Sequence, residues 1–281
     1  MRQMIKKRLC TFIILIMISI CTTGCSLDEY VEMGYYLIES EATDKDEDNY
    51  IELTEEERKL LVDHASDASK ERVGEGKLES YEKSYLEKIR GMKNYLKKKY
   101  PSYDIKLKKF SISSLLFSKT SKYLFELIYD DESYSAEISF DSEDNPTYKD
   151  DFFAYILRME CDTRITKLLQ NNESDVHSYT SVGVGLRGDD VDENTSIDEY
   201  RVLRPDFEAW TYIYIEQDDD KEVAEQIWNA LIKEEISDVY VLMFIGNDMN
   251  VKYADTYTNR RHYPYYMFKK GDIELKKYDE E

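Results

Sequence analysis

One stretch of this chain permits only one kind of secondary structure. From residue 78 to residue 96, large apolar side chains recur at spacings of three and four, which places them on one face of an α-helix. These side chains are Leu78, Tyr81, Tyr85, Ile89, Met92 and Leu96. Lys97, Lys98 and Lys99 occupy the last turn, where positive charge suits the helix dipole, and Pro101 prevents the helix from continuing. We therefore predict a long helix that lies across one face of a sheet.

The segments on either side of this helix complete a first predicted unit. Thr54 and Glu57 have the spacing of a capping box, so a helix is predicted to begin there and to end near Gly74. Alternating or aromatic-rich segments after the long helix predict three strands. The predicted strands are residues 105–112, 123–129 and 134–140, with a turn at residues 130–133. Residues 141–146 are polar and break the pattern, and the apolar positions of residues 152–169 predict a closing helix.

A second unit is predicted towards the end of the chain. Residues 209–215 are rich in aromatic and aliphatic side chains and predict a strand, while Asp219 and Glu222 repeat the capping-box spacing ahead of a helix. Residues 239–245 are apolar without a charge, as expected for a strand that is covered on both faces. Further short strands are predicted at residues 251–257, 265–268 and 273–276.

Together these elements predict an α+β fold, with an antiparallel sheet and flanking helices in two small subdomains. A chain of 281 residues can bury one large core or two smaller ones, and we favour two. The predicted segments are a signal peptide at 1–24, an acidic tether at 25–53, an α-β-β-β-α subdomain at 54–172, a polar linker at 173–197 and a β-α-β-β subdomain at 198–281.

The first residues have the order of a secretory signal. Arg2, Lys6, Lys7 and Arg8 make a basic start, an apolar run covers residues 9–20, and small residues precede a cysteine at position 25. At about 1.5 Å of helical rise per residue, the apolar run covers roughly 18 Å, which is too short for the ~30 Å hydrocarbon core of a bilayer. We therefore expect this segment to be removed after export.

The ending Thr22-Thr23-Gly24-Cys25 resembles the lipobox of bacterial lipoproteins. That resemblance implies a diacylglycerol on the Cys25 thiol, cleavage before Cys25 and, often, an acyl chain such as palmitate on the new amino group. Each buried methylene contributes about 0.8 kcal/mol to membrane binding, so two or three chains hold durably. The expected location is extracytoplasmic, at the cell membrane, through the lipid anchor. The rest of the chain carries no motif that assigns it to a family.

The net charge and the cysteine content indicate which partners and which reactions are unsuited to this chain. The formal net charge is −21, which argues against nucleic acid as a partner because phosphate binding requires a positive surface. Beyond the signal and the anchor only Cys161 remains, so we expect no intramolecular disulfide. Glu160 and Asp162 flank this thiol and would suppress the reactive thiolate, so a packed structural role is predicted for Cys161.

Motifs for a cofactor, a metal ion or a catalytic nucleophile are not convincing in this sequence. Gly183, Gly185 and Gly188 match a dinucleotide-binding spacing, but the acidic residues 189–192 follow where a phosphate-binding helix should begin. Two acidic clusters lack the glycine and glutamate positions of a calcium loop, so we interpret them as a helix start and a loop. These clusters are residues 218–220 and residues 141–144. We expect no cofactor and no metal ion.

Residues 253–268 form the most unusual segment after the signal. Tyrosines surround a basic tip, and such a tip can bind anionic or sugar ligands through charge-assisted hydrogen bonds and stacking. The candidate ligand-binding residues are Arg260, Arg261, His262 and Tyr263. The alternative is a hairpin whose tyrosines pack on the sheet and whose arginines pair with nearby acids.

These observations predict a membrane-anchored extracytoplasmic lipoprotein that acts as a binding or assembly module of the cell envelope, with no catalytic residues. Its partner would be an envelope protein or a wall polymer. The alternatives are a cell-envelope hydrolase that uses carboxylates and an accessory subunit of a secretion, conjugation or uptake complex. A deep polar pocket with converging carboxylates would favour the enzyme, whereas a shallow apolar or aromatic patch would favour the binding module.

Overall fold

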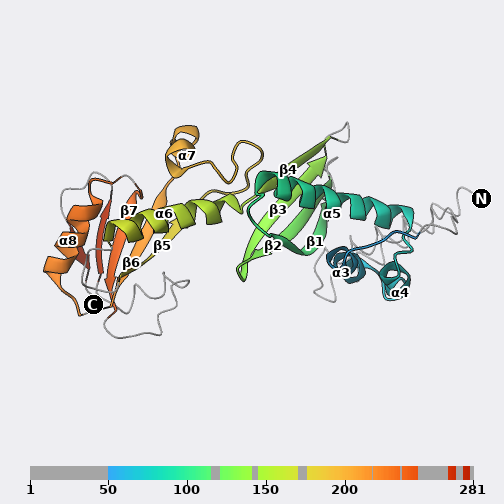
Figure 1. The fold of residues 1–281 in the computed structure, drawn as a ribbon, viewed down its shortest axis with the longest axis horizontal. Coiled ribbons are helices and arrows are strands. Elements are labelled where there is room, and N and C mark those ends of the chain that lie inside the picture. Colours follow the sequence, from blue (N-terminus) through green and yellow to red (C-terminus); the bar gives the residue numbers. More distant parts are fainter. Residues whose placement is uncertain are drawn as a thin grey trace, which may run out of the picture.

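Two β-sheets and the helices around them make up the described part of the chain. The structure is a computed structural model, and it describes residues 50–114, 121–140, 145–169, 176–216, 218–234, 236–245, 265–269 and 275–278. A four-stranded sheet and a five-stranded sheet follow one another along the long axis of the molecule (Figure 1). The predicted α+β class is confirmed. Among the described helices, none has the length and apolar character needed to cross a membrane.

The helical start of the first unit differs from the prediction in one respect. Helix α3 spans Glu55–His64 and begins with the predicted capping box, in which Thr54 and Glu57 bond to each other's backbone. The helix does not continue to Gly74, because the chain leaves it at Ala65 and starts again as α4, Lys70–Gly74. Between the two helices the Ser66 and Ser69 hydroxyls hydrogen-bond to each other, and such local bonds compete with a helix.

The last residues of the predicted tether belong to the folded body. Leu53 is buried, and the Ile51 amide donates to the Gly76 carbonyl at 2.9 Å. Gly76 has a φ of +80°, and a Cβ built there would lie 2.3 Å from the Ile51 carbonyl oxygen. Only glycine tolerates this approach without a shift of the backbone. Residues 51–53 are therefore part of the folded body and not of a tether.

The long helix and the first sheet form the expected pair of layers. Helix α5, Ser80–Lys99, buries the predicted apolar stripe and crosses the sheet (Figure 1). The sheet has the antiparallel order β1-β2-β3-β4, with a two-residue turn at Asp130 and Asp131, whose φ angles are both positive. Its strands are β1 Lys106–Ser114, β2 Ser121–Tyr129, β3 Glu132–Phe140 and β4 Pro146–Asp150.

Strand β4 was not predicted. Its sequence, Pro146 to Asp150, is polar, and it pairs along β3 as the last strand of the sheet, with a single bridge from Asp150 to Arg187 on its other side. Proline is tolerated at the first position of an edge strand, where its missing donor matters little. The hydrophobic pattern that reveals buried strands is therefore absent here.

Helix α6, Phe153–Leu169, was predicted to close the first unit, and instead it serves both sheets. At its start, the Phe152 and Tyr155 rings stack at 5.3 Å between centroids and contact aromatic residues of the first sheet. Further along, α6 packs against strand β5 of the second sheet and against helix α8. Its buried side chains follow no single face, which is the pattern of a helix covered on several sides.

The second sheet is mixed and not wholly antiparallel. Its order is β5-β6-β7-β8-β9, and the β6–β7 pair is parallel because helix α8, Lys221–Leu231, provides a crossover between them. The strands are β5 Val176–Val182, β6 Ala209–Ile215, β7 Val239–Phe244, β8 Tyr265–Lys269 and β9 Lys276–Tyr278. The predicted linker 173–197 thus contains a strand of the sheet, whose polar alternation concealed it. The predicted strand at 251–257 lies outside the described residues.

The apolar character of β7 has the predicted consequence. All of its residues are buried, with Tyr240, Leu242 and Phe244 facing the main core and Val239, Val241 and Met243 in a second cluster. The main core is continuous from Leu53 to Phe268 and therefore includes side chains of both sheets. The division of the chain into units at 54–172 and 198–281 remains a prediction.

Candidate functional site

The predicted site residues all lie outside the part of the chain that the structure describes. Lipidation of Cys25 and ligand binding by Arg260, Arg261, His262 and Tyr263 therefore stay predictions. The acidic cluster at residues 141–144 lies outside the described residues as well.

Three other sequence features are described by the structure. Cys161 is fully buried, and burial, followed by the charges of Asp162 and Glu160, raises the pKa of its thiol to about 12. Strand β5 ends before Gly183, and the next helix, α7 (Ile197–Leu203), begins only after an acidic loop. Asp220, one residue later than predicted, caps helix α8 by accepting from the Glu222 amide at 2.8 Å.

Between the two sheets lies a buried ion pair that the sequence did not reveal. Asp150, the last residue of β4, has a side chain that is 0% exposed, and Lys99, in the last turn of α5, has one that is 3% exposed. Lys99 Nζ donates to Asp150 Oδ2 at 2.8 Å. The surrounding core contains no bulk water, so this pair requires further hydrogen bonds to be tolerated.

Those further bonds satisfy both carboxylate oxygens of Asp150. Oδ2 also accepts from the Tyr95 hydroxyl at 2.8 Å, and Oδ1 accepts from the Tyr100 hydroxyl at 2.8 Å and the Phe152 amide at 3.0 Å. Burial and the Asp150 charge raise the pKa of both tyrosines, so they remain protonated donors. The carboxylate is enclosed by donors and does not face solvent.

The same cluster holds the loop after β5 against the end of the first sheet. Asp150 and Arg187 exchange two backbone hydrogen bonds of 2.9 and 2.7 Å, and the Arg187 carbonyl also accepts from Lys99 Nζ at 3.0 Å. The Arg187 side chain continues the contact, because its Nε donates to the Tyr200 hydroxyl of α7 at 2.9 Å. We call Tyr95, Lys99, Tyr100, Asp150 and the Arg187 backbone the junction cluster.

The sequence contained one usable sign of this cluster. Lys99 follows Leu96 by three residues, so it continues the apolar stripe of α5 and points to the core rather than to solvent. The helix dipole alone explains Lys97 and Lys98, which are exposed, but not a lysine on the buried face. Asp150, in contrast, follows a polar segment with no pattern.

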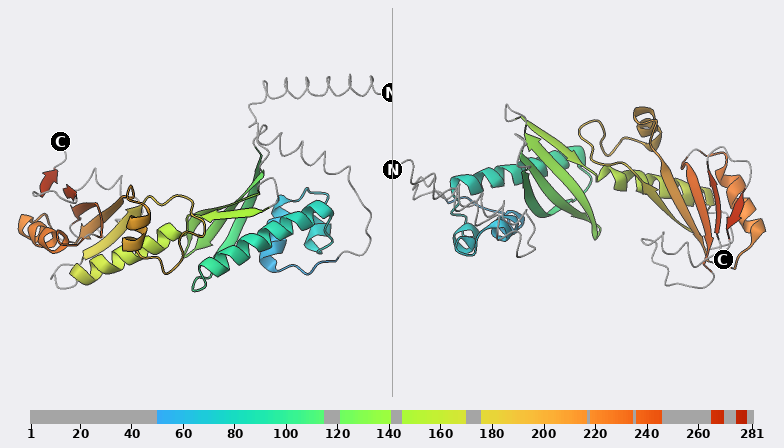
Figure 2. Two further views of the ribbon diagram at one scale, coloured as in Figure 1. Left: turned by 90° about the horizontal axis from the view of Figure 1, so that it is seen from above. Right: turned by 180° about the vertical axis from the view of Figure 1, so that it is seen from behind.

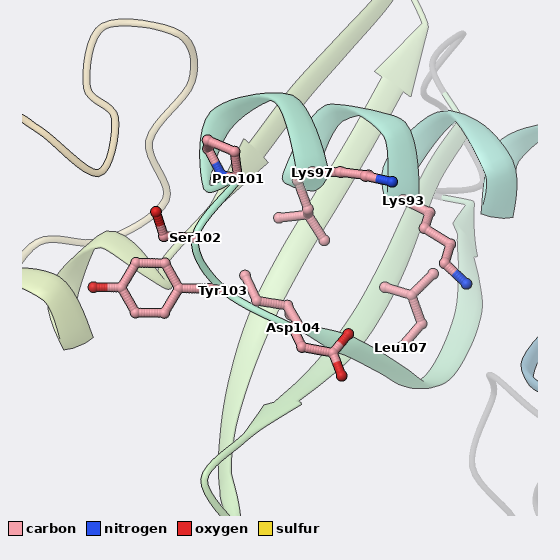
Figure 3. A pocket seen from close by; sticks show the side chains of 9 residues that line it. Lys93, Lys97, Pro101, Ser102, Tyr103, Asp104 and Leu107 are labelled. Carbon is pink, nitrogen blue, oxygen red and sulfur yellow. The ribbon is translucent and has the colours of Figure 1, made fainter.

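A first hollow, of about 360 Å³, opens beside the end of α5 (Figure 3). Leu96, Ile105 and Leu107 supply apolar atoms, while Lys93, Lys97 and Asp104 supply charge. Lys93 is already paired with Glu56 of α3, and the same carboxylate accepts from the Leu107 amide at 2.7 Å. This mixed surface, with one of its lysines neutralised, has no dominant charge.

A second hollow, of about 520 Å³, lies beside α7 and is open to solvent. Val202 and Leu203 contribute apolar side chains that are 81% and 52% exposed. The polar residues that line it are Asp190, Asp192, Asn194, Thr195 and Glu199. Unlike the first hollow, it combines an apolar surface with a single sign of charge.

Asp162, a partly buried carboxyl group of α6, faces the second sheet. Asp162 Oδ1 accepts from the Thr180 hydroxyl at 2.7 Å, and Thr180 is also 2.9 Å from the Thr211 hydroxyl, which contacts Ser237. Burial raises the pKa of Asp162 to about 6, against the opposing effects of Thr180 and Arg158. This chain of hydroxyls connects α6 to strands β5 and β6 and to the loop before β7.

Within the described ranges, no group of three or more histidine, cysteine, aspartate or glutamate side chains is placed to hold a metal ion. No protein-family model, curated protein or solved structure matches this chain. The function must therefore be inferred from the residues themselves.

Proposed function

We propose that this protein is a membrane-anchored extracytoplasmic lipoprotein that acts as a binding or assembly module of the cell envelope. The observation that carries the binding role is the open hollow beside α7, where exposed Val202 and Leu203 lie among acidic side chains. Exposed apolar side chains rimmed by polar groups are typical of interaction surfaces. The anchor is supported by the basic start, the short apolar run and Cys25.

The hydrogen bonds of Asp150 and Asp162 favour this role over a hydrolase. Acid-base catalysis requires a carboxyl group within hydrogen-bond reach of a substrate. The Asp150 oxygens accept from Lys99, two tyrosines and a backbone amide, and Asp162 of α6 accepts from Thr180 of β5. Both groups therefore serve the fold, and neither lines one of the two hollows.

The charge and the tether suit a body that is held away from the membrane. An acidic protein is repelled by an anionic membrane surface, but this repulsion fades beyond a Debye length of about 8 Å at physiological salt. The segment between Cys25 and the folded body would average about 30 Å as a flexible coil. The body can therefore meet envelope partners without contact with the lipid surface.

Substitution of Cys25 tests the anchor. In cells that produce the protein, Cys25→Ala should move the body from the membrane fraction to the soluble extracytoplasmic fraction, because the acyl chains have lost their attachment atom. Cys10→Ala, within the predicted signal, is the matched control and should leave the fractionation unchanged. Equal membrane retention of Cys25→Ala and the parent would rule out the lipid anchor.

Crosslinking in the producing cells, followed by mass spectrometry, tests the binding role. A reproducible set of crosslinked envelope proteins would support an assembly module. The identities of these proteins would show whether the chain is instead an accessory subunit of a secretion, conjugation or uptake complex. Recovery of glycan alone would direct attention to wall polymers.

A further inference from the structure

The outer surface of α7 is unusual because its apolar side chains face solvent while the rest of the helix is firmly attached. Ile197 and Tyr200 are fully buried, whereas Val202 is 81% and Leu203 52% exposed. Helix α7 stands out from the body in Figure 1 and in the right-hand view of Figure 2. The exposed pair is therefore accessible from outside the molecule.

Contacts from both sheets hold α7 in place. Arg201 forms a bidentate pair with Asp238 at 2.9 and 3.0 Å, which joins the helix to the start of β7. The Tyr200 hydroxyl accepts from Arg187, the residue whose backbone bonds to Asp150. The helix N-terminus is fixed as well, since Glu160 of α6 accepts from the Ile197 amide at 2.8 Å. A surface fixed in this way loses little conformational entropy when a partner binds.

The charges around Val202 and Leu203 select the kind of partner. Asp190, Asp192 and Glu199 line the same hollow, and none of the described residues that line it is basic. Hydrogen bonds from Ser196 lower the pKa of Glu199, so its carboxylate is ionised at neutral pH. Arg204, the next residue along the chain, pairs with Asp206 at 3.3 Å, and its charge also acts on Asp190, so the hollow keeps its negative charge mainly through Asp192 and Glu199.

We propose that the α7 surface, defined by Asp190, Asp192, Glu199, Val202 and Leu203, is a docking site for a basic amphipathic segment of a partner protein. The apolar side chains of such a segment would cover Val202 and Leu203, and its lysines or arginines would pair with the three carboxylates. A second copy of this chain fits poorly, because it would bring the same acids and a formal net charge of −21 to the contact. The proposal rests on the binding role proposed above and names the partner's chemistry.

A direct binding measurement tests this surface. The full-length protein is placed in nanodiscs of neutral phosphatidylcholine, and binding of a labelled synthetic peptide with leucine and lysine at helical spacing is measured, with empty nanodiscs subtracted. Changing Val202 and Leu203 together to Ser should weaken binding at least tenfold, because the apolar contact is lost. Ile232→Ser, at another exposed apolar residue, should leave the affinity unchanged. A peptide with glutamate in place of lysine should not bind.

Each other outcome would overturn the assignment. Equal affinity of the peptide for the parent and for the Val202→Ser, Leu203→Ser variant would show that the peptide binds acidic surfaces of the protein in general. Concentration-dependent dimers of the parent that the same variant abolishes would make a second copy the occupant. Thermal unfolding of the variant provides the fold control, and its midpoint should match that of the parent because both side chains are exposed. The Cys25→Ala fractionation tests the anchor independently, so a failure of peptide binding removes only this surface.

Discussion

Replacing Lys99 by Met should lower the free energy of unfolding and cause the two sheets to unfold at different urea concentrations. The methionine keeps the apolar stem but leaves the Asp150 carboxylate buried without its cation. Removing one partner of a buried ion pair costs about 3–5 kcal/mol. Because Tyr95, Tyr100 and the Phe152 amide still donate to Asp150, we expect a loss near the lower value, about 3 kcal/mol in the free energy of unfolding.

The chain provides a convenient assay for this prediction. Both of its tryptophans, Trp210 and Trp228, belong to the second sheet and its helix α8, so their fluorescence reports that part alone, whereas far-UV circular dichroism reports the whole fold. In urea, the two signals of the parent should change together, because one continuous core includes both sheets. In Lys99→Met they should change at different urea concentrations.

Two further variants make the result decisive. Lys98→Met, at the exposed neighbouring position, should stay within about 0.5 kcal/mol of the parent. Asp150→Asn added to Lys99→Met should recover about 1–2 kcal/mol, since the buried charge is gone while an acceptor oxygen remains. If Lys99→Met unfolds at the same urea concentration as Lys98→Met, the buried pair does not stabilise the fold as we describe. If stability falls but the two signals still coincide, the cluster does not couple the sheets.

Two other substitutions test separate features. The pKa of Asp162 is raised in the fold from 3.8 to about 6, so protonation favours the folded state, and the contribution of Asp162 to the free energy of unfolding should fall by about 2 kcal/mol as the pH rises from about 4 to about 7. Asp162→Asn should lack this part of the pH dependence, and a constant difference between the two proteins in urea unfolding at each pH would contradict the assignment. Gly76→Ala should lower stability by at least about 1–2 kcal/mol, because its φ is positive and its Cβ would meet the Ile51 carbonyl. Gly74→Ala, where a Cβ has ordinary space, should leave stability nearly unchanged. Thermal unfolding of the two variants and the parent measures both effects.

The elements with a strong internal pattern could be predicted from the sequence. The stripe of α5, the capping box of α3 and the uncharged run of β7 each define a structure by themselves, because burial on one face or on both leaves a period in the sequence. Strands β4 and β5 left no such period, since β4 pairs at a sheet edge and β5 alternates polar groups that bond inside the sheet, as Thr180 does with Thr211.

The candidate site was less predictable for a different reason. Its residues come from distant parts of the chain, and only the fold brings Lys99 to Asp150 and Arg187. The exposure of Val202 and Leu203 depends equally on which side of α7 meets the sheets. An apolar pair in a sequence carries no sign of whether it is covered. Such features require the tertiary structure.

The junction cluster also bears on the order in which this protein takes shape as it is made. A protein is synthesised from its N-terminus, so α5 and β4 are available before the loop that carries Arg187. During that interval, Lys99 and Asp150 can already pair, but the carbonyl that completes the lysine's bonds has not yet arrived. In the nascent chain, water can accept the third hydrogen bond of Lys99. This water would have to leave when the Arg187 backbone pairs with Asp150. Completion of the junction cluster would then be a late step of folding, after the first sheet has formed.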